Sequence, residues 1–187
     1  MDALSLAADP ITVGALVGAL ALILFAAAWH KLSGPDTFAG ALAAYAILPQ
    51  WTVRPIGRVL PVVEAALGAG ILVPATRPVA LPMVAALVLL YAAAMAVNLM
   101  RGRRDIDCGC GGAAHPVSWG LVSRNLVVAG AALIASRPML ERPVDWFDAT
   151  TLMLGVLALY GLYLMADELL RQASRLAQLT RHGSEEG

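Results

Sequence analysis

The chain has few charged residues. Asp, Glu, Lys and Arg make up 14% of its 187 residues, whereas hydrophobic residues make up 59%. Soluble domains carry about 25% charged residues, so this composition excludes an ordinary soluble domain. The formal net charge is zero, which gives no electrostatic reason to expect nucleic acid as a partner. The chain also lacks the Walker, dinucleotide-binding, HExxH and nucleophile-elbow motifs, which argues against the common soluble enzyme classes.

Long apolar runs account for most of the sequence. They predict an all-α fold, a polytopic transmembrane helix bundle with about five spans. The spans are expected near residues 11–29, 56–73, 79–100, 117–136 and 149–166. Residues 1–170 would form a single transmembrane domain and residues 171–187 a charged C-terminal tail. Asp2 and Asp9 precede the first run, with no Lys or Arg, so we expect a retained span rather than a cleaved signal peptide.

Residues 36–49 form a shorter apolar segment. Phe38, Leu42 and Tyr45 repeat at helical spacing. At about 1.5 Å per residue the segment cannot cross about 30 Å of hydrocarbon. We therefore predict an interfacial or re-entrant helix, and four spans plus this helix is the alternative count.

Basic residues are distributed unevenly between the two ends of the predicted spans. Five spans put the chain ends on opposite sides, and all but three of the 13 Lys and Arg residues then fall on one side. The three exceptions are Arg77, Arg137 and Arg142. Loops rich in Lys and Arg stay in the cytoplasm. We therefore expect the C-terminus and the loop 101–116 there.

The only two cysteines, Cys108 and Cys110, lie two positions apart in this loop. Their spacing favours a redox-active dithiol. A disulfide across one residue closes a very small ring, and Gly109, Gly111 and Gly112 supply the backbone freedom that such a ring needs. A strained disulfide is easily reduced, which suits exchange better than structural cross-linking.

Two other interpretations of the pair stay open. Two thiolates with His115 could bind Cu(I) or zinc, although a closed zinc site needs four ligands, and we predict no metal site. The pair could also be two small residues in a tight loop without chemistry. His115 is either an exposed loop residue or a general base for the thiols. The nearby cation Arg104 would favour the thiolate, whereas Asp107 would oppose it.

Three polar residues interrupt the predicted spans. Glu64 lies inside the second span, and Arg124 and Asn125 lie in the first turns of the fourth. Ionisable groups in a bilayer usually face the bundle interior or water. We consider a structural ion pair for Glu64, with His30, Lys31 or Arg124 as partner, beside a role with protons or a quinone. Arg124 either reaches back to the interface or points toward the cysteine loop.

The stretch around the cysteines resembles the methylamine utilisation protein MauE family. The resemblance is carried by Arg104–Gly112 (RDIDCGCGG) and Val117–Asn125 (VSWGLVSRN). Two earlier stretches, Ala28–Leu32 (AWHKL) and Pro61–Glu64 (PVVE), are similar to the wider DoxX-like group. The resemblance covers roughly residues 11 to 170.

This resemblance implies a DoxX-like, multi-pass protein of the bacterial inner (plasma) membrane. The family's role is maturation of the methylamine dehydrogenase small subunit, a periplasmic, disulfide-rich protein with a tryptophan-derived quinone. The family acts beside a thioredoxin-like periplasmic partner of the MauD type. Cys108 and Cys110 would then pass disulfides or electrons toward that partner. A membrane quinone is the one cofactor we consider.

The expected orientation conflicts with this role, because it puts the cysteine loop in the cytoplasm and the client in the periplasm. A crossing by residues 36–49, or a quinone acting as a second redox station, would remove the conflict. Two functions of other classes are the alternatives. One is a scaffold that anchors a thioredoxin-like partner without chemistry, and the other is a metal or solute transporter relying on Glu64, Asn98 and Arg124.

Overall fold

The computed structural model describes residues 9–104, 106–109, 116–139 and 145–185. Regular structure in these residues is helical, apart from one isolated antiparallel bridge between Asp107 and Pro116. The helices are α2 (Pro10–Ser33), α3 (Pro35–Ala44), α4 (Gln50–Leu72), α5 (Arg77–Met100), α6 (Trp119–Ala135) and α7 (Trp146–Glu185). The predicted all-α class is confirmed.

Four of these helices are long and apolar enough to cross a membrane: α2, α4, α5 and the Trp146–Ser174 part of α7. The fifth apolar helix, α6, has 17 residues. It rises about 25 Å, which is at the short end of the range for a transmembrane helix. The chain is therefore a polytopic helical membrane protein.

Local sequence signals fix several helix ends. The Asp9 carboxylate accepts a hydrogen bond from the Ile11 N–H at 2.9 Å, and Pro10 occupies the first turn of α2. Ser118 caps α6 in the same way through the Leu121 N–H. Gly102 ends α5 with a φ of +77°, the left-handed conformation that glycine adopts without a steric penalty.

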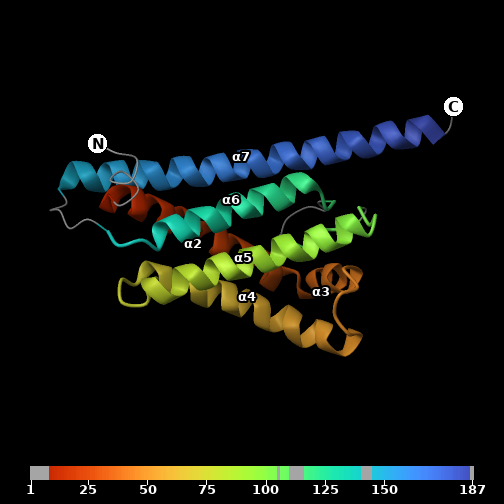
Figure 1. Cartoon of the computed structure of the whole chain (residues 1–187), viewed down its shortest axis with the longest axis horizontal. Helices are drawn as coiled ribbons and strands as arrows, with labels where there is room; N and C mark the ends of the chain where they lie inside the picture. The colour runs from red at the N-terminus through yellow and green to blue at the C-terminus, as the bar shows by residue number, and fades with distance from the viewer. Residues whose placement is uncertain (1–8, 105, 110–115, 140–144, 186–187) are drawn as a thin grey trace.

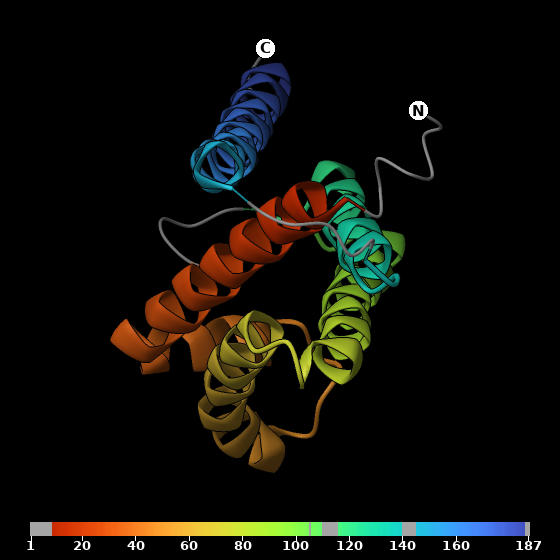
Figure 2. The same ribbon diagram turned by 90° about the vertical axis from the view of Figure 1, so that its left-hand side faces the viewer.

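Four helices close into a ring in which each packs on the next: α2 on α4, α4 on α5, α5 on α6, and α6 on α2. Figure 2 shows this ring with α7 lying outside it. The helices alternate in direction, so α3, the loop after α5 and the end of α7 lie at one end of the molecule, to the right in Figure 1. This order fits the five-span arrangement expected from the sequence.

Helix α7 joins the ring mainly through α2. Gly14 and Gly18 make the close approach, because a Cβ on either would lie 2.4 or 2.5 Å from Leu152 Cδ1 or Val156 Cγ2. Small residues spaced four apart let membrane helices come this close.

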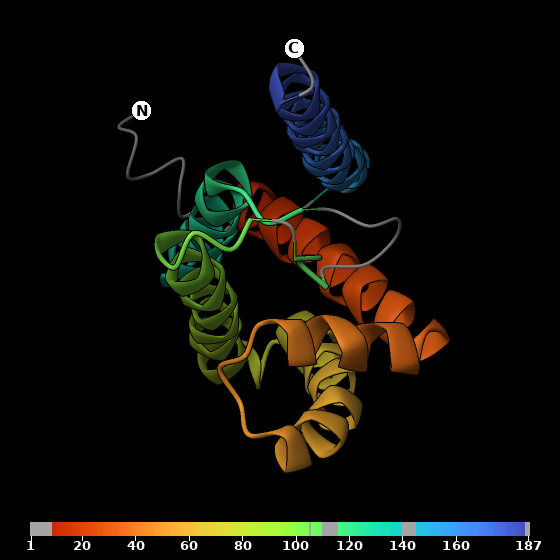
Figure 3. The same ribbon diagram turned by 90° about the vertical axis from the view of Figure 1, so that its right-hand side faces the viewer.

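Helix α3 is shorter than the predicted 36–49 segment and ends at Ala44. The chain leaves the helix at Ala46, which has a φ of +49°, and Pro49 then precedes α4. Ten residues rise about 15 Å, too little for a crossing. Figure 3 shows α3 lying across one end of α2 and α4. The idea that this segment crosses the membrane is therefore wrong.

Two other helices differ from their expected limits. Helix α2 continues to Ser33, so Lys31 lies within the helix and is 4% exposed rather than ending the span at an interface. Helix α7 runs without a break from Trp146 to Glu185, so the fifth span and the tail share one helix.

Candidate functional site

A cavity of about 290 Å³ lies inside the ring, in the half nearest the cysteine loop. Four residues predicted as site residues line it: Glu64, Cys108, Arg124 and Asn125. They come from α4, from the loop after α5 and from α6. The fold thus brings together polar residues that are widely separated in the sequence, in a space that is otherwise mostly apolar.

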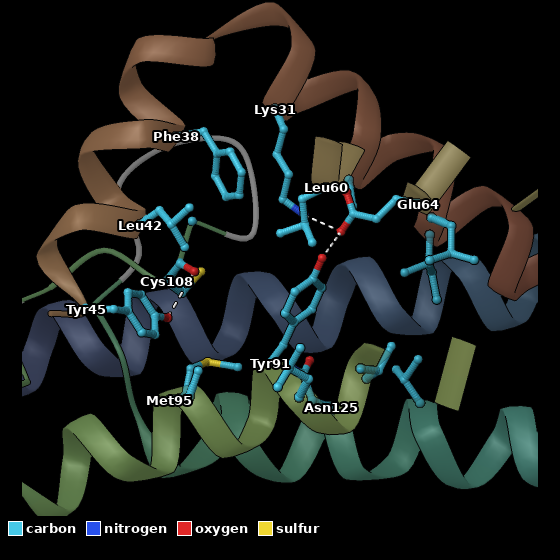
Figure 4. Close-up of a pocket in the computed structure, with 18 of the residues that line it drawn as sticks. Lys31, Phe38, Leu42, Tyr45, Leu60, Glu64, Tyr91, Met95, Cys108 and Asn125 are labelled. Carbon is cyan, nitrogen blue, oxygen red and sulfur yellow. Dashed lines mark hydrogen bonds and ion pairs between the residues drawn. The ribbon is translucent and has the colours of Figure 1, made fainter. Parts of the chain in front are cut away.

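The polar centre of the cavity is Glu64, which is 1% exposed. Lys31 of α2 forms a buried ion pair with its Oε1. The Tyr91 hydroxyl of α5 donates a hydrogen bond to the same oxygen at 2.8 Å. Figure 4 shows both donors converging on this atom. Of the partners considered from the sequence, Lys31 is the one that the structure pairs with Glu64.

The second carboxylate oxygen of Glu64 is also buried. Oε2 has no hydrogen-bond partner among the described residues. Leaving a buried acceptor unsatisfied typically costs about 1–3 kcal/mol, and buried polar atoms without partners are rare. Because Glu64 lines the cavity, a bound molecule with a donor group can satisfy this atom.

Two aromatic rings flank the ammonium group. Lys31 Nζ lies 5.2 Å from the centre of the Phe38 ring and 5.0 Å from that of Tyr91. These distances are typical of cation–π contacts. The rings and Glu64 together compensate for burial of the lysine charge.

A second ion pair closes another side of the cavity. Arg124 of α6 pairs with Asp167 of α7, and its NH2 donates to the Asn125 Oδ1 at 3.3 Å. The guanidinium carbon lies 5.2 Å from the centre of the Tyr163 ring. Arg124 therefore points inward and joins α6 to α7 rather than reaching back to the interface.

The cysteine loop is fixed against α3. Cys108 is 9% exposed, and its carbonyl accepts a hydrogen bond of 3.1 Å from the Tyr45 hydroxyl. Asp107 accepts one of 3.0 Å from the Gly109 N–H through its side chain. The Val117 N–H donates to the Ile106 carbonyl at 3.0 Å, which draws the two ends of the loop together.

Gly109, between the two cysteines, has a φ of +66°. A Cβ at this position would lie 3.3 Å from Cε2 of Phe38 and 3.5 Å from the Cβ of Ala41. The glycine therefore serves both the left-handed turn and the close contact with α3. This turn directs Cys108 toward the cavity.

The other predicted site residues are placed differently. Cys110 and His115 lie outside the described residues. Arg104 is exposed at the surface and does not line the cavity. Among the described residues, no group of three or more His, Cys, Asp and Glu could hold a metal ion.

Sequence reasoning did not single out three residues that shape the site: Tyr45, Tyr91 and Asp167. Tyr91 is a hydroxyl-bearing residue in an otherwise apolar span, and Asp167 is the first charge after the fifth span. Neither feature indicates a partner, and only the packing shows that Tyr91 meets Glu64 and Asp167 meets Arg124.

Comparison with known proteins adds the family context. A family model described as methylamine utilisation protein MauE matches residues 9–137. The MauE protein of Paracoccus denitrificans is 45% identical over 130 residues, which cover 67% of this chain and 68% of that protein. The MauE protein of Paracoccus versutus is 38% identical over 164 residues, covering 86% and 88%. The MauE protein of Methylophilus methylotrophus is 36% identical over 154 residues, covering 79% and 80%. No solved structure matches.

The region matched by the family model holds nearly all of the site. It spans α2 to α6 and includes every residue that lines the cavity except Tyr163 of α7. The cavity therefore belongs to the part of the chain that this family defines.

Proposed function

The chain belongs to the MauE family of methylamine utilisation proteins, and on that premise we propose that it supports maturation of a methylamine dehydrogenase small subunit. It acts from the bacterial inner membrane by thiol–disulfide exchange at Cys108 and Cys110. A thioredoxin-like periplasmic protein of the MauD type is the partner, and the dehydrogenase small subunit is the client.

One observation carries the proposal. The chain's only two cysteines share one loop, and the described one is held at the cavity by Tyr45, Asp107 and the contact of Gly109 with α3. A loop without chemistry needs no such fixed position. The glycines around the pair allow the small ring of a Cys-x-Cys disulfide, which is strained and therefore readily exchanged.

Substitution of the cysteines tests the proposal in cells. The chromosomal gene is replaced by Cys108→Ser, Cys110→Ser or the double variant, and active dehydrogenase is measured in cells that grow on another carbon source and are then exposed to methylamine. We expect each substitution to abolish maturation while the protein level in the membrane stays unchanged. Ser33→Ala, a change of similar size at an exposed position at the same end of the molecule, serves as the control and should mature the enzyme normally.

The same strains distinguish thiol–disulfide exchange from the alternative function, a scaffold that anchors the partner without chemistry. Full dehydrogenase activity in the double variant would exclude thiol exchange. If the thioredoxin-like partner still co-purified with that variant, the chain would act as an anchor.

A further inference from the structure

We propose that the cavity binds a membrane quinone, which accepts two electrons and two protons from the Cys108–Cys110 dithiol. The inference rests on the proposed thiol–disulfide function and adds the electron acceptor that such a cycle requires. Three features of the cavity support this inference: the cavity is reached from the lipid, it has a polar end, and Cys108 lines it.

The cavity is reached from the lipid. Leu90 of α5 lines it and is 62% exposed, and Ile47, in the loop between α3 and α4, lines it and is 44% exposed. An apolar side chain exposed on a membrane-spanning helix faces hydrocarbon. A ligand that enters between such residues must be soluble in the bilayer, which excludes nucleotides and other charged metabolites.

The polar end of the cavity suits a neutral ligand with oxygen atoms. The charges of Lys31 and Glu64 cancel, as do those of Arg124 and Asp167, so the cavity does not attract an ion. Lys31 and Tyr91 both use Oε1 of Glu64, and the buried Oε2 has no partner among the described residues. A quinol hydroxyl can donate to Oε2, and the Lys31 ammonium, which has three N–H donors and uses one on Glu64, can donate to a quinone carbonyl.

The cavity also suits a planar ring. The Phe38 and Tyr91 rings flank its polar end, and such faces stack on flat ligands. Its volume of about 290 Å³ is at the lower end of the range for ligand sites, about 300–1,000 Å³. A quinone head group therefore fits, with its isoprenoid tail leaving toward the lipid. Cys108 lines the same space.

The redox step balances without another reactant. The S–H bonds of Cys108 and Cys110 break, and an S–S bond forms between the two sulfur atoms. Two electrons and two protons pass to the quinone, and its two carbonyl oxygens become the hydroxyl groups of the quinol. Glu64 accepts a hydrogen bond from one quinol hydroxyl, and Tyr91 is a positioning residue, since its hydroxyl holds the Glu64 carboxylate.

Binding is tested on the purified full-length chain with decylubiquinone as the probe. We expect the quinone to raise the melting temperature, because a ligand that binds the folded state stabilises it. Tyr91→Phe removes one hydroxyl at the polar end and should weaken binding about tenfold. Leu60→Trp fills the cavity and should abolish the shift. Tyr160→Phe removes a hydroxyl outside the cavity and should bind like the unaltered chain.

Electron transfer is tested on the same samples. The chain is reduced, freed of reductant and mixed with decylubiquinone, and we expect one quinol per chain. The Cys108→Ser, Cys110→Ser double variant should form no quinol, even at a decylubiquinone concentration that saturates its binding. Absence of binding, binding unchanged by Leu60→Trp, or a bound quinone that stays oxidised would each overturn the inference. Quinone reduction in vitro combined with normal maturation in the double-variant strain would instead reject the proposed function alone.

Discussion

Lys31 and Glu64 show what a buried charge requires in this fold. Both side chains are almost fully enclosed, at 4% and 1% exposure. Taking two charges out of water costs several kcal/mol each, and their attraction offsets this only with good geometry and further hydrogen bonds. Tyr91 and the ring of Phe38 supply that support. The pair joins α2 to α4 at the wall of the cavity.

Substituting one member of this ion pair should lower the unfolding free energy much more than substituting both members. Lys31→Met leaves the Glu64 charge buried without its counterion, and we expect a loss of about 3–5 kcal/mol in unfolding free energy. The double variant Lys31→Met, Glu64→Leu removes both charges and should recover most of the loss. Thermal unfolding of the purified variants in detergent measures the difference. Equal melting temperatures for the single and double variants would contradict a directly coupled pair.

Gly109 controls the position of Cys108. Gly109→Ala forces an L side chain into a left-handed conformation, at a cost of about 1–2 kcal/mol, and drives its Cβ against Phe38. We expect the loop to separate from α3 and Cys108 to react faster with a maleimide, measured in a Cys110→Ser background. Gly40→Ala, on α3 with no heavy atom within 4 Å of the added Cβ, is the control and should leave the rate unchanged.

At the residue scale, the sequence predicted several polar residues of the site but not the residues with which they pair. Glu64, Arg124 and Asn125 stood out because polar groups inside apolar spans must face an interior. Tyr91 carries no charge and passed as part of an apolar helix. Its role depends on the rotation of α5 against α4, which is set by packing over the whole interface and not by any local pattern.

Among the four helices long enough to cross a membrane, α7 is the least enclosed, since no residue in its apolar window is buried. It packs mainly on α2, at Gly14 and Gly18. The sequence predicted both helices, but it did not indicate that they pack against each other. It also missed the early end of α3, because a positive φ at Ala46 is a rare conformation with no sequence signature.

Engineered cross-linking tests this contact. A Cβ on Gly155 would lie 3.1 Å from the Cβ of Ala15, so a small outward shift of α7 brings the pair into the range of about 3.5–4.5 Å found for disulfide-bonded residues. We expect Ala15→Cys with Gly155→Cys to cross-link α2 to α7 upon oxidation, in a background lacking the native cysteines. Adding Gly18→Leu should strongly reduce the cross-linked fraction because the side chain meets Val156. Gly130→Leu, at an open position of α6, should not reduce it.

For the whole molecule, the arrangement of the helices shows which Lys and Arg residues can serve as evidence for its orientation in the membrane. Lys31 and Arg124 are held in buried ion pairs, so they are poor evidence for orientation. The asymmetry persists without them, because Arg54, Arg58 and Arg101 still lie at the end that carries α3 and the cysteine loop. Since α3 cannot cross, no rearrangement of the described helices moves this loop to the other end.

The positive-inside rule therefore predicts that this end faces the cytoplasm. Single reporters in a background without native cysteines test it: Ala75→Cys in the exposed loop between α4 and α5, and Ser33→Cys at the exposed end of α2. We expect a membrane-impermeant maleimide to label Ala75→Cys in intact cells, and Ser33→Cys only after permeabilisation. In that orientation Cys108 cannot exchange directly with a periplasmic thioredoxin, and the electrons that the dithiol gives to the quinone reach the periplasmic side only through the quinol. The reverse labelling would place the loop in the periplasm, where direct exchange with that partner needs no carrier and the quinone serves only as the final electron acceptor.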